Sequence, residues 1–306
     1  MSGFFEVMVS GVLLGAVYGL GALGISLIFG VMRILNLAHG AFMVAGGVGA
    51  WTLMKYGGYG LMVSVPLVFG LTFSAGFILC RWGLDRTRST VDPENELGDL
   101  SDYLLVTLGF TLIVDDLVAR WSSQGVFSLP LEGTTLHFWG VSISNFKLML
   151  LGMVVMVFAG FSLLIRFTDF GRMIRACTQN REGAVLMGIS YERVSSLVFA
   201  VGCALAGLAG NFYLMLYPLR AEMAIPLTIK ALLIVVLGGM GKLFHTLTAA
   251  MFLGMVEVLT GYFSSTESQA VIPYIGMVAV LLLWPRGIGH ARARVGYGNA
   301  TVEDGR

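Results

Sequence analysis

The chain has 306 residues, of which 57% are hydrophobic and only 12% are charged. Soluble domains carry about 25% charged residues, so this composition excludes a water-soluble globule. The formal net charge of +1 gives no overall field that would attract nucleic acid, so we expect an all-α polytopic membrane protein, embedded in a lipid bilayer, with no nucleic-acid partner.

Long apolar runs predict the membrane spans, because a spanning helix needs about 20 mostly apolar residues. The runs cover residues 7–30, 38–54, 61–82, 103–121, 148–165, 193–216, 228–240, 246–263 and 271–285. The seventh run is short and ends in Gly238-Gly239-Met240-Gly241, which suits a half-helix or a re-entrant segment. We predict eight or nine transmembrane helices in one domain over residues 1–290, followed by a cytoplasmic tail over 291–306.

The distribution of Lys and Arg predicts the orientation, because short cytoplasmic loops carry an excess of both residues. They concentrate in the loops at 83–102 and 166–193 and in the C-terminal tail, whereas the loops at 122–147 and 264–270 carry almost none. We expect the first three regions in the cytoplasm and the other two outside. The N-terminus then lies outside if there are nine spans and inside if there are eight.

Three glycines recur at four-residue spacing in the first run, at Gly11, Gly15 and Gly19. Small residues at this spacing form a groove in which a second helix can pack closely. The groove can receive a helix of the same chain, or it can form an interface with a partner subunit.

Polar residues follow the first run in Leu35-Asn36-Leu37-Ala38-His39-Gly40. If this segment re-enters the membrane, its backbone must lie inside protein or beside a cavity, and Asn36 and His39 then become candidates for lining a translocation path. The alternative is a cytoplasmic turn, in which Arg33 follows the excess of Lys and Arg that cytoplasmic loops carry. We expect no metal site, since no second ligand residue lies near His39 in the sequence.

Two adjacent carboxylates, Asp115 and Asp116, lie near the expected outer end of the run at 103–121. One of them could attract a cationic ligand to a translocation path. The alternative is a position at the wet interface beside Arg120. Both carboxylates cannot stay ionised in one dry pocket without a large rise in pKa.

The segment at 168–192 is too charged to span a membrane, and apolar residues alternate with its charges as in an amphipathic surface helix. Asp169 is a candidate N-cap and Gly188 a candidate stop. Such a helix can lie on the membrane surface, or it can dock into a groove on a cytoplasmic partner.

Lys230 and Glu257 lie within neighbouring apolar runs. A charge in hydrocarbon costs several kcal/mol unless it is paired or hydrated, so both residues are functional candidates. They can line a translocation path for a zwitterion, or they can form a structural ion pair that joins two helices.

The chain lacks the usual nucleotide-binding and catalytic motifs. Gly241-Lys242 resembles part of a phosphate loop, but Val236 replaces the first glycine and Leu243 the Ser or Thr. There is no GxSxG elbow and no nucleophile–base pair at a fixed spacing. We therefore expect no enzyme activity and no cofactor, and any ATPase must be a separate chain.

Four groups of residues stand in a characteristic order along the chain. The first group comprises 27–31, 33–36 and 38–40; the second Thr168, Gly171, Arg172, Arg175, Ala176, Ala184, Leu186, Gly188 and Ile189; the third Lys230, Ala231, 236–239, Gly241, Gly254 and Glu257; and the fourth 284–287. Over about residues 7–290, this order resembles that of permease subunits in the branched-chain amino-acid ABC importer family. Urea and short-amide importers share these motifs.

The resemblance implies a permease that carries branched-chain or related small amino acids inward across the bacterial cytoplasmic membrane. It implies a second homologous permease subunit, two cytoplasmic ATP-binding subunits and a periplasmic substrate-binding protein as partners. The segment at about 170–190 would be a coupling helix, with the following residues facing the ATPase: Arg172, Arg175, Ala176, Glu182, Ala184 and Gly188. A urea or short-amide permease and an ion-coupled secondary transporter are the alternatives.

Overall fold

Helices make up nearly all of the described secondary structure, as expected for an all-α protein. The computed structural model describes residues 2–84, 96–121, 125–129, 135–138 and 141–264, with single residues at 271, 274, 275, 278, 279 and 282. Most of the predicted span at 271–285 and the whole tail at 291–306 lie outside the described residues.

The helices follow the predicted runs closely. They are α1 (Ser2–Met32), α2 (His39–Lys55), α3 (Leu61–Ile78) with its π-helical continuation η1 (Leu79–Leu84), α5 (Glu96–Trp121), α6 (Asn145–Phe167), α7 (Asp169–Gln179), α8 (Arg181–Leu186), α9 (Tyr191–Leu214), the short 3₁₀ turn η2 (Ala221–Met223), α10 (Ala224–Gly238) and α11 (Leu243–Phe263). Two small antiparallel pairs join β1 (Val126–Phe127) to β4 (Leu219–Arg220), and β2 (Thr135–Phe138) to β3 (Val141–Ser144).

Six helical segments of the described chain are long and apolar enough to cross a membrane. These are Phe4–Met32, Leu61–Leu84, Asn145–Phe167, Tyr191–Leu214, Ala221–Gly238 and Leu243–Phe263. The helices α2 and α5 occupy two further predicted runs but are not among the six. The first has only 17 residues, and the second carries acidic residues toward both of its ends.

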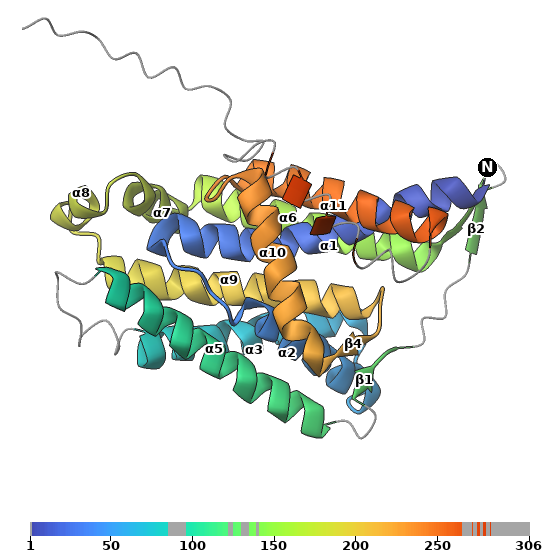
Figure 1. The fold of residues 1–306 in the computed structure, drawn as a ribbon, viewed down its shortest axis with the longest axis horizontal. Helices are drawn as coiled ribbons and strands as arrows, with labels where there is room; N and C mark the ends of the chain where they lie inside the picture. The colour runs from blue at the N-terminus through green and yellow to red at the C-terminus, as the bar shows by residue number, and fades with distance from the viewer. Residues whose placement is uncertain are drawn as a thin grey trace, which may run out of the picture.

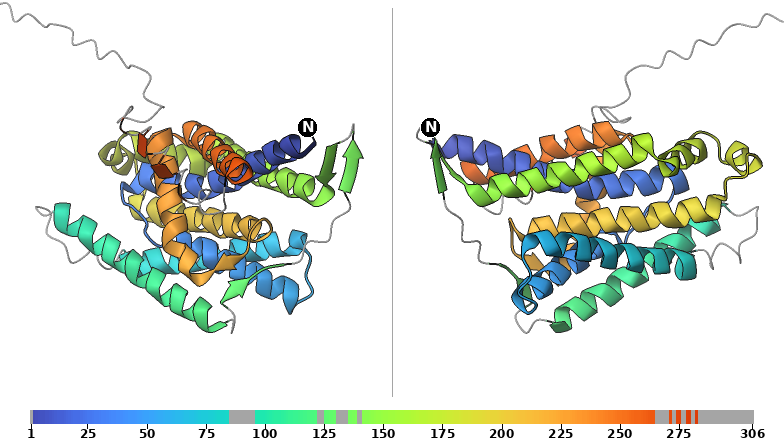
Figure 2. Two further views of the ribbon diagram at one scale, coloured as in Figure 1. Left: turned by 45° about the vertical axis from the view of Figure 1, so that its right-hand side comes forward. Right: turned by 180° about the vertical axis from the view of Figure 1, so that it is seen from behind.

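Two helices, α1 and α9, form the centre of the bundle (Figure 1). Both are apolar on all sides, which is typical of a helix surrounded by protein. Helix α1 packs against α11 and α9, and α9 packs in turn against α2 and α3. Helix α10 crosses the direction of the others (Figure 1), and the N-terminus lies at the opposite end of the bundle from α7 and α8 (Figure 2).

The glycine groove of α1 receives α11 of the same chain. A Cβ atom built on Gly15 would lie 2.7 Å from the Cα of Met251, and one built on Gly254 would lie 2.4 Å from the Cα of Gly15. Gly11 faces Met255 in the same way. The two backbones therefore touch directly, which is the first of the two arrangements that the glycine spacing allowed.

Gly15→Val is expected to lower the free energy of unfolding by at least about 1–3 kcal/mol, because the contact is with backbone that cannot rotate away. Thermal unfolding of the purified chain in mild detergent measures the change. Gly160→Val is the matched control, because a Cβ atom on this α6 glycine meets nothing within 4 Å. Equal stability of the two variants would contradict the packing of α1 on α11.

Candidate functional site

The chain between α1 and α2 turns back into the interior of the bundle. His39, at the start of α2, places its Nε2 atom 2.8 Å from the carbonyl oxygen of Gly21, 18 residues earlier on α1. Asn36 and His39 are both completely buried, whereas Arg33 is exposed. The side chains of Asn36 and His39 therefore lie inside the protein, and both alternatives for the segment, re-entrant and cytoplasmic turn, must include this burial.

The hydroxyl of Thr228 on α10 satisfies part of the irregular backbone. It accepts a hydrogen bond from the backbone N–H of Gly40 at 2.8 Å and lies 3.2 Å from the carbonyl oxygen of Leu37. The Thr111 hydroxyl on α5 lies 3.3 Å from the same carbonyl. Backbone outside a helix is tolerated at membrane depth only when protein or water satisfies it, so these two threonines make the break possible.

Asn36 holds the turn from within. Its side-chain oxygen accepts a hydrogen bond from the Ala38 N–H at 3.0 Å, and its amide nitrogen lies 3.8 Å from the sulfur of Cys203. On the α9 side, the Tyr191 hydroxyl donates to the carbonyl of Val31 at 3.1 Å, which satisfies an acceptor at the end of α1. The non-helical segment between α1 and α2 is therefore hydrogen-bonded to side chains of α5, α9 and α10.

His39 is packed as a buried core residue. Because its Nε2 atom faces a carbonyl acceptor, that nitrogen must carry the proton. The other ring nitrogen, Nδ1, is buried and has no hydrogen-bond partner within the described part of the chain. A Cβ atom on Gly24 would lie 2.9 Å from the ring, so the glycine provides the space that the imidazole fills.

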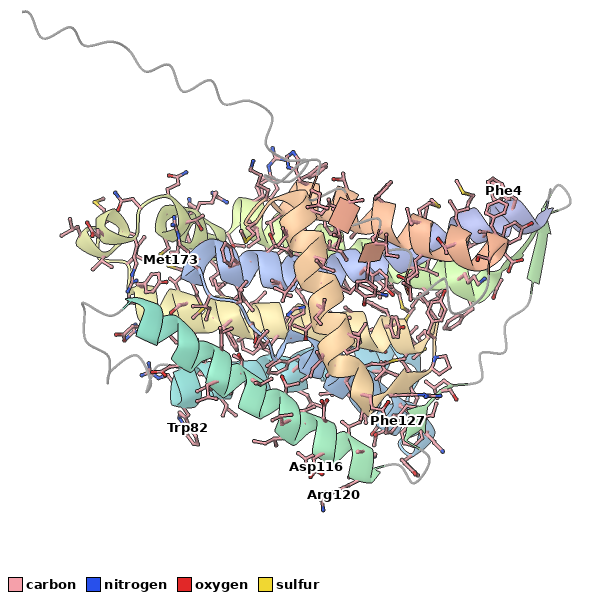
Figure 3. All side chains as sticks on the ribbon, in the orientation of Figure 1. Phe4, Trp82, Asp116, Arg120, Phe127 and Met173 are labelled. Carbon is pink, nitrogen blue, oxygen red and sulfur yellow. The ribbon has the colours of Figure 1, made fainter. Side chains whose placement is uncertain are left out.

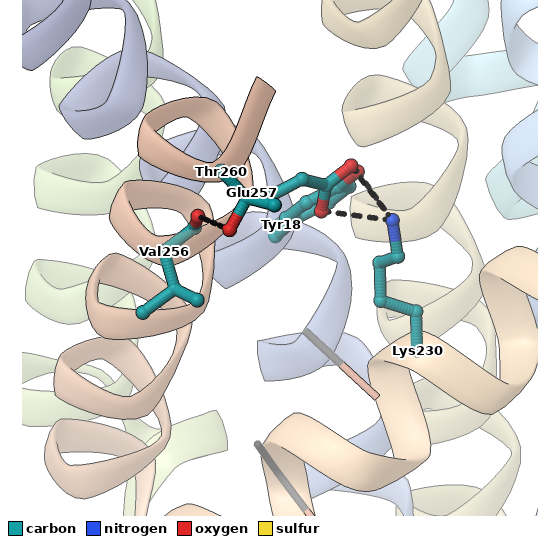
Figure 4. A network of polar contacts seen from close by, with 5 residues as sticks. All are labelled: Tyr18, Lys230, Val256, Glu257 and Thr260. Carbon is teal, nitrogen blue, oxygen red and sulfur yellow. Dashed lines mark hydrogen bonds and ion pairs between the residues drawn. The ribbon is translucent and has the colours of Figure 1, made fainter. Parts of the chain in front are cut away.

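Lys230 and Glu257 form a buried ion pair that includes Tyr18 (Figure 4). The Lys230 ammonium donates to both carboxylate oxygens of Glu257, at 2.9 and 3.0 Å, and to the Tyr18 hydroxyl at 2.8 Å. The Tyr18 hydroxyl in turn donates to the carboxylate at 3.1 Å. All three ammonium protons are used, and the network joins α10, α11 and α1.

Aromatic rings surround this pair. The Tyr18 ring lies 4.6 Å from the Lys230 ammonium and stacks on Tyr213. Tyr274, from the region of the predicted last span, lies 5.8 Å from the same ammonium. The rings stabilise the cation, so the arrangement is compatible with a structural ion pair and with a path lining for a zwitterion.

Asp116 and Arg120 form an ion pair on the outer surface of α5, with 2.8 Å between the carboxylate oxygen and Nε (Figure 3). Both side chains are mostly exposed, which agrees with the interfacial alternative for this carboxylate. Asp115 differs, because it is partly buried and its Oδ1 atom has no partner in the described residues. It follows Thr111 by one helical turn, on the side of α5 that faces the bundle.

The charged segment forms two helices, where the sequence predicted one over about 170–190. Asn180 adopts an extended backbone between α7 and α8, and its side chain accepts a hydrogen bond from the Gly183 N–H at 2.9 Å, which starts the second helix. The first helix is capped by Thr168, whose hydroxyl accepts from the Gly171 N–H, and not by Asp169 as expected. Asp169 instead pairs with Arg172.

Gly188 ends α8 as predicted. Its φ angle is +85°, its N–H bonds to the carbonyl of Val185, and the N–H of Ile189 bonds to the carbonyl of Ala184. These two bonds form a Schellman motif, which favours glycine because of the positive φ.

The apolar residues of this segment divide into two groups, which the sequence pattern did not separate. Ile174, Cys177 and Ala184 are buried against the bundle, and burial raises the pKa of the Cys177 thiol. Leu186 and Met187, at the C-terminal end of α8, are 87% and 84% exposed. The α7–α8 segment projects beyond the end of the bundle (Figure 1). Of the predicted coupling residues, Arg172, Arg175, Glu182 and Gly188 are exposed, Ala176 is partly buried and Ala184 is buried.

Sequence reasoning missed the groups that complete the buried sites. Thr111 and Thr228 satisfy the broken backbone, and Tyr18 completes the ion pair. Their signal was weak but present, because each is a hydroxyl-bearing residue within a mostly apolar run. Their partners lie up to 239 residues away in the sequence, so spacing alone did not connect them.

These features define a multi-pass helical membrane protein with a buried non-helical segment between its first two helices and a charged segment that projects from one end. The chain belongs to the family described as branched-chain amino acid transport system / permease component, whose model matches residues 7–281. Members of this family are transport subunits and not enzymes.

Individual relatives cover almost the whole chain. The high-affinity branched-chain amino acid transport system permease protein LivH of Salmonella typhimurium is 28% identical over 93% of this chain and 95% of its own. BraD of Pseudomonas aeruginosa, a permease protein of the same description, is 26% identical over the same shares. LivM of Salmonella typhimurium is 25% identical over 89% of this chain and 67% of its own. No solved structure matches the chain significantly.

Proposed function

We propose that this chain is a permease subunit of an ATP-driven importer that carries branched-chain or related small amino acids into the cell. The observation that carries the proposal is the family match over residues 7–281, together with relatives named as branched-chain amino acid permeases. The multi-pass helical fold supports it.

The proposed location is the bacterial cytoplasmic membrane, with eight or nine spans and, for nine, an external N-terminus. The helices α2 and α5 add two candidate spans to the six long apolar segments, and the sequence run at 271–285, which lies mostly outside the described residues, is the candidate ninth. The position of the N-terminus opposite the arginine-rich α7–α8 segment supports the orientation (Figure 1).

A second, homologous permease subunit completes the membrane part of the complex. The similarity of this chain to both LivH and LivM supports a pair of related subunits. Two cytoplasmic ATP-binding subunits and a periplasmic binding protein complete the importer.

The α7–α8 segment couples this chain to an ATP-binding subunit. Apolar side chains that are almost fully exposed at the tip of a charged projection are typical of a protein-docking site. Leu186 and Met187 provide them, and Arg172, Arg175 and Glu182 provide charged contacts nearby. The translocation path runs beside the non-helical segment at Asn36 and His39, with Lys230, Glu257 and Asp115 as further candidates for its lining.

The double variant Leu186→Asp/Met187→Asp is expected to reduce co-purification of the ATP-binding subunit about tenfold or more, because truncating or charging a docking anchor typically costs 2 kcal/mol or more. Affinity purification of the tagged chain from its own membrane, followed by mass spectrometry, measures the ratio. Phe167→Asp is the control, since this exposed apolar residue lies at the same end of the bundle outside the segment. An unchanged ratio in the double variant would overturn the coupling role.

A further inference from the structure

A large basic cavity lies where η1, α8 and the start of α9 converge, next to the proposed coupling segment. It has a volume of about 1010 Å³ and is lined by Arg81 of η1, Arg181 of α8 and Arg193 of α9. Among the described residues that line it, Glu192 is the acidic one. The excess of arginine gives the cavity a positive potential, which favours an anionic occupant.

Apolar residues line the same cavity one helical turn deeper. Phe77 precedes Arg81 by four residues on α3–η1, and Leu197 follows Arg193 by four residues on α9. Residues four apart lie on the same face of a helix, so each helix presents a basic group at the end of the bundle and an apolar group below it. This layering matches a phospholipid, with its phosphate at the arginines and its acyl chains below.

The surroundings place the cavity at the depth of the lipid headgroups. Trp82, next to Arg81, is 77% exposed (Figure 3), and tryptophan is enriched at the membrane–water interface. Ile78, one turn deeper on the same helix, is also exposed, as expected for a surface that faces lipid. A free phosphate ion would use the arginines but not the apolar layer.

The arginines suit a phosphate in geometry as well as in charge. A guanidinium group binds phosphate oxygens through paired N–H donors. The Arg181 guanidinium lies 4.1 Å from the centre of the Tyr191 ring, a contact that positions the group without neutralising its charge.

We propose that this cavity binds an anionic membrane phospholipid, whose headgroup links η1 to the α8–α9 corner. The bound lipid would hold the proposed coupling segment against the membrane core. The proposal goes beyond transport itself and does not depend on which substrate is carried.

The proposal is tested by titrating the full chain, together with the subunits that purify with it, with phosphatidylglycerol. Native mass spectrometry measures how much of the lipid is bound. Arg181→Gln/Arg193→Gln is expected to bind this lipid about tenfold more weakly than the unmodified chain. Arg181→Lys/Arg193→Lys, which keeps the charge, is expected to retain most of the binding and shows that the corner still folds. Arg166→Gln is the matched control, because this exposed arginine lies at the same end of the bundle beside Phe167 and outside the cavity.

Any of the following outcomes would overturn the proposal. One is equal binding of phosphatidylglycerol by the glutamine double variant and the Arg166→Gln control. Another is equal binding of zwitterionic phosphatidylcholine, or equal occupancy with inorganic phosphate alone. The last is loss of the ATP-binding subunit from the glutamine double variant with unchanged lipid binding, which would assign the cavity to a protein partner.

Discussion

Lys230→Met is expected to lower the free energy of unfolding by about 3–5 kcal/mol, because it leaves Glu257 as a buried charge without its partner. The ammonium donates three hydrogen bonds within the network, so the carboxylate and Tyr18 both lose a donor. Thermal unfolding of the purified chain in mild detergent measures the loss. Lys147→Met is the matched control, because its pair with Glu6 is partly exposed and should contribute less than about 1 kcal/mol.

The double variant Lys230→Met/Glu257→Gln separates the two roles that the ion pair can have. Glutamine retains an acceptor for Tyr18 while both charges are removed, so the double variant should recover most of the stability. If the pair only joins helices, transport recovers together with stability. If the pair lines the path, the double variant folds but does not transport. A double variant as unstable as Lys230→Met would contradict the ion pair itself.

Gly40→Ala is expected to destabilise the chain by at least about 3 kcal/mol and to abolish folding in the membrane if the break cannot relax. A Cβ atom at this position would lie 1.8 Å from the carbonyl oxygen of Ala224 and 2.5 Å from the Thr228 hydroxyl. The first of these atoms belongs to the backbone of α10, so the whole helix would have to move. Expression level and thermal unfolding in detergent measure the effect.

Gly49→Ala is the control on the same helix, because a Cβ atom there meets nothing within 4 Å. It should be neutral, or stabilising by about 0.5–1 kcal/mol from the higher helix propensity of alanine. Thr228→Val removes the hydroxyl that bonds the Gly40 N–H and should lower the free energy of unfolding by about 1–3 kcal/mol. Thr228→Ser keeps the hydroxyl and should lower it less. A Gly40→Ala variant as stable as Gly49→Ala would refute the close approach of α2 to α10.

The apolar runs located the helices because the pattern that drives membrane insertion is local. The run at 193–216 corresponds to α9 within two residues at each end, and that at 246–263 to α11 within three at its start. The glycine spacing of the first run likewise anticipated close packing. Its partner helix could not be deduced, since α1 meets α11 through contacts more than 200 residues apart in the sequence.

The candidate sites were predicted less completely, because they depend on contacts between distant segments. Lys230 and Glu257 stood out as charges in apolar runs, but their bond through Tyr18 depends on how α10 crosses α1. The complete burial of Asn36 and His39 depends on tertiary packing, so the sequence could not predict it. The single helix expected in the charged segment was wrong, because the capping preference of Asn180 outweighed the continuous amphipathic pattern.

Amino-acid uptake by proteoliposomes tests the proposed function most directly, with the complex purified through a tag on this chain. We predict that labelled leucine accumulates only when ATP is supplied on the side of α7–α8 and the binding protein is supplied on the other side. This uptake should survive ionophores and excess urea. Uptake that follows an ion gradient and ignores ATP, or that urea or a short amide abolishes by competition, would contradict the proposed function.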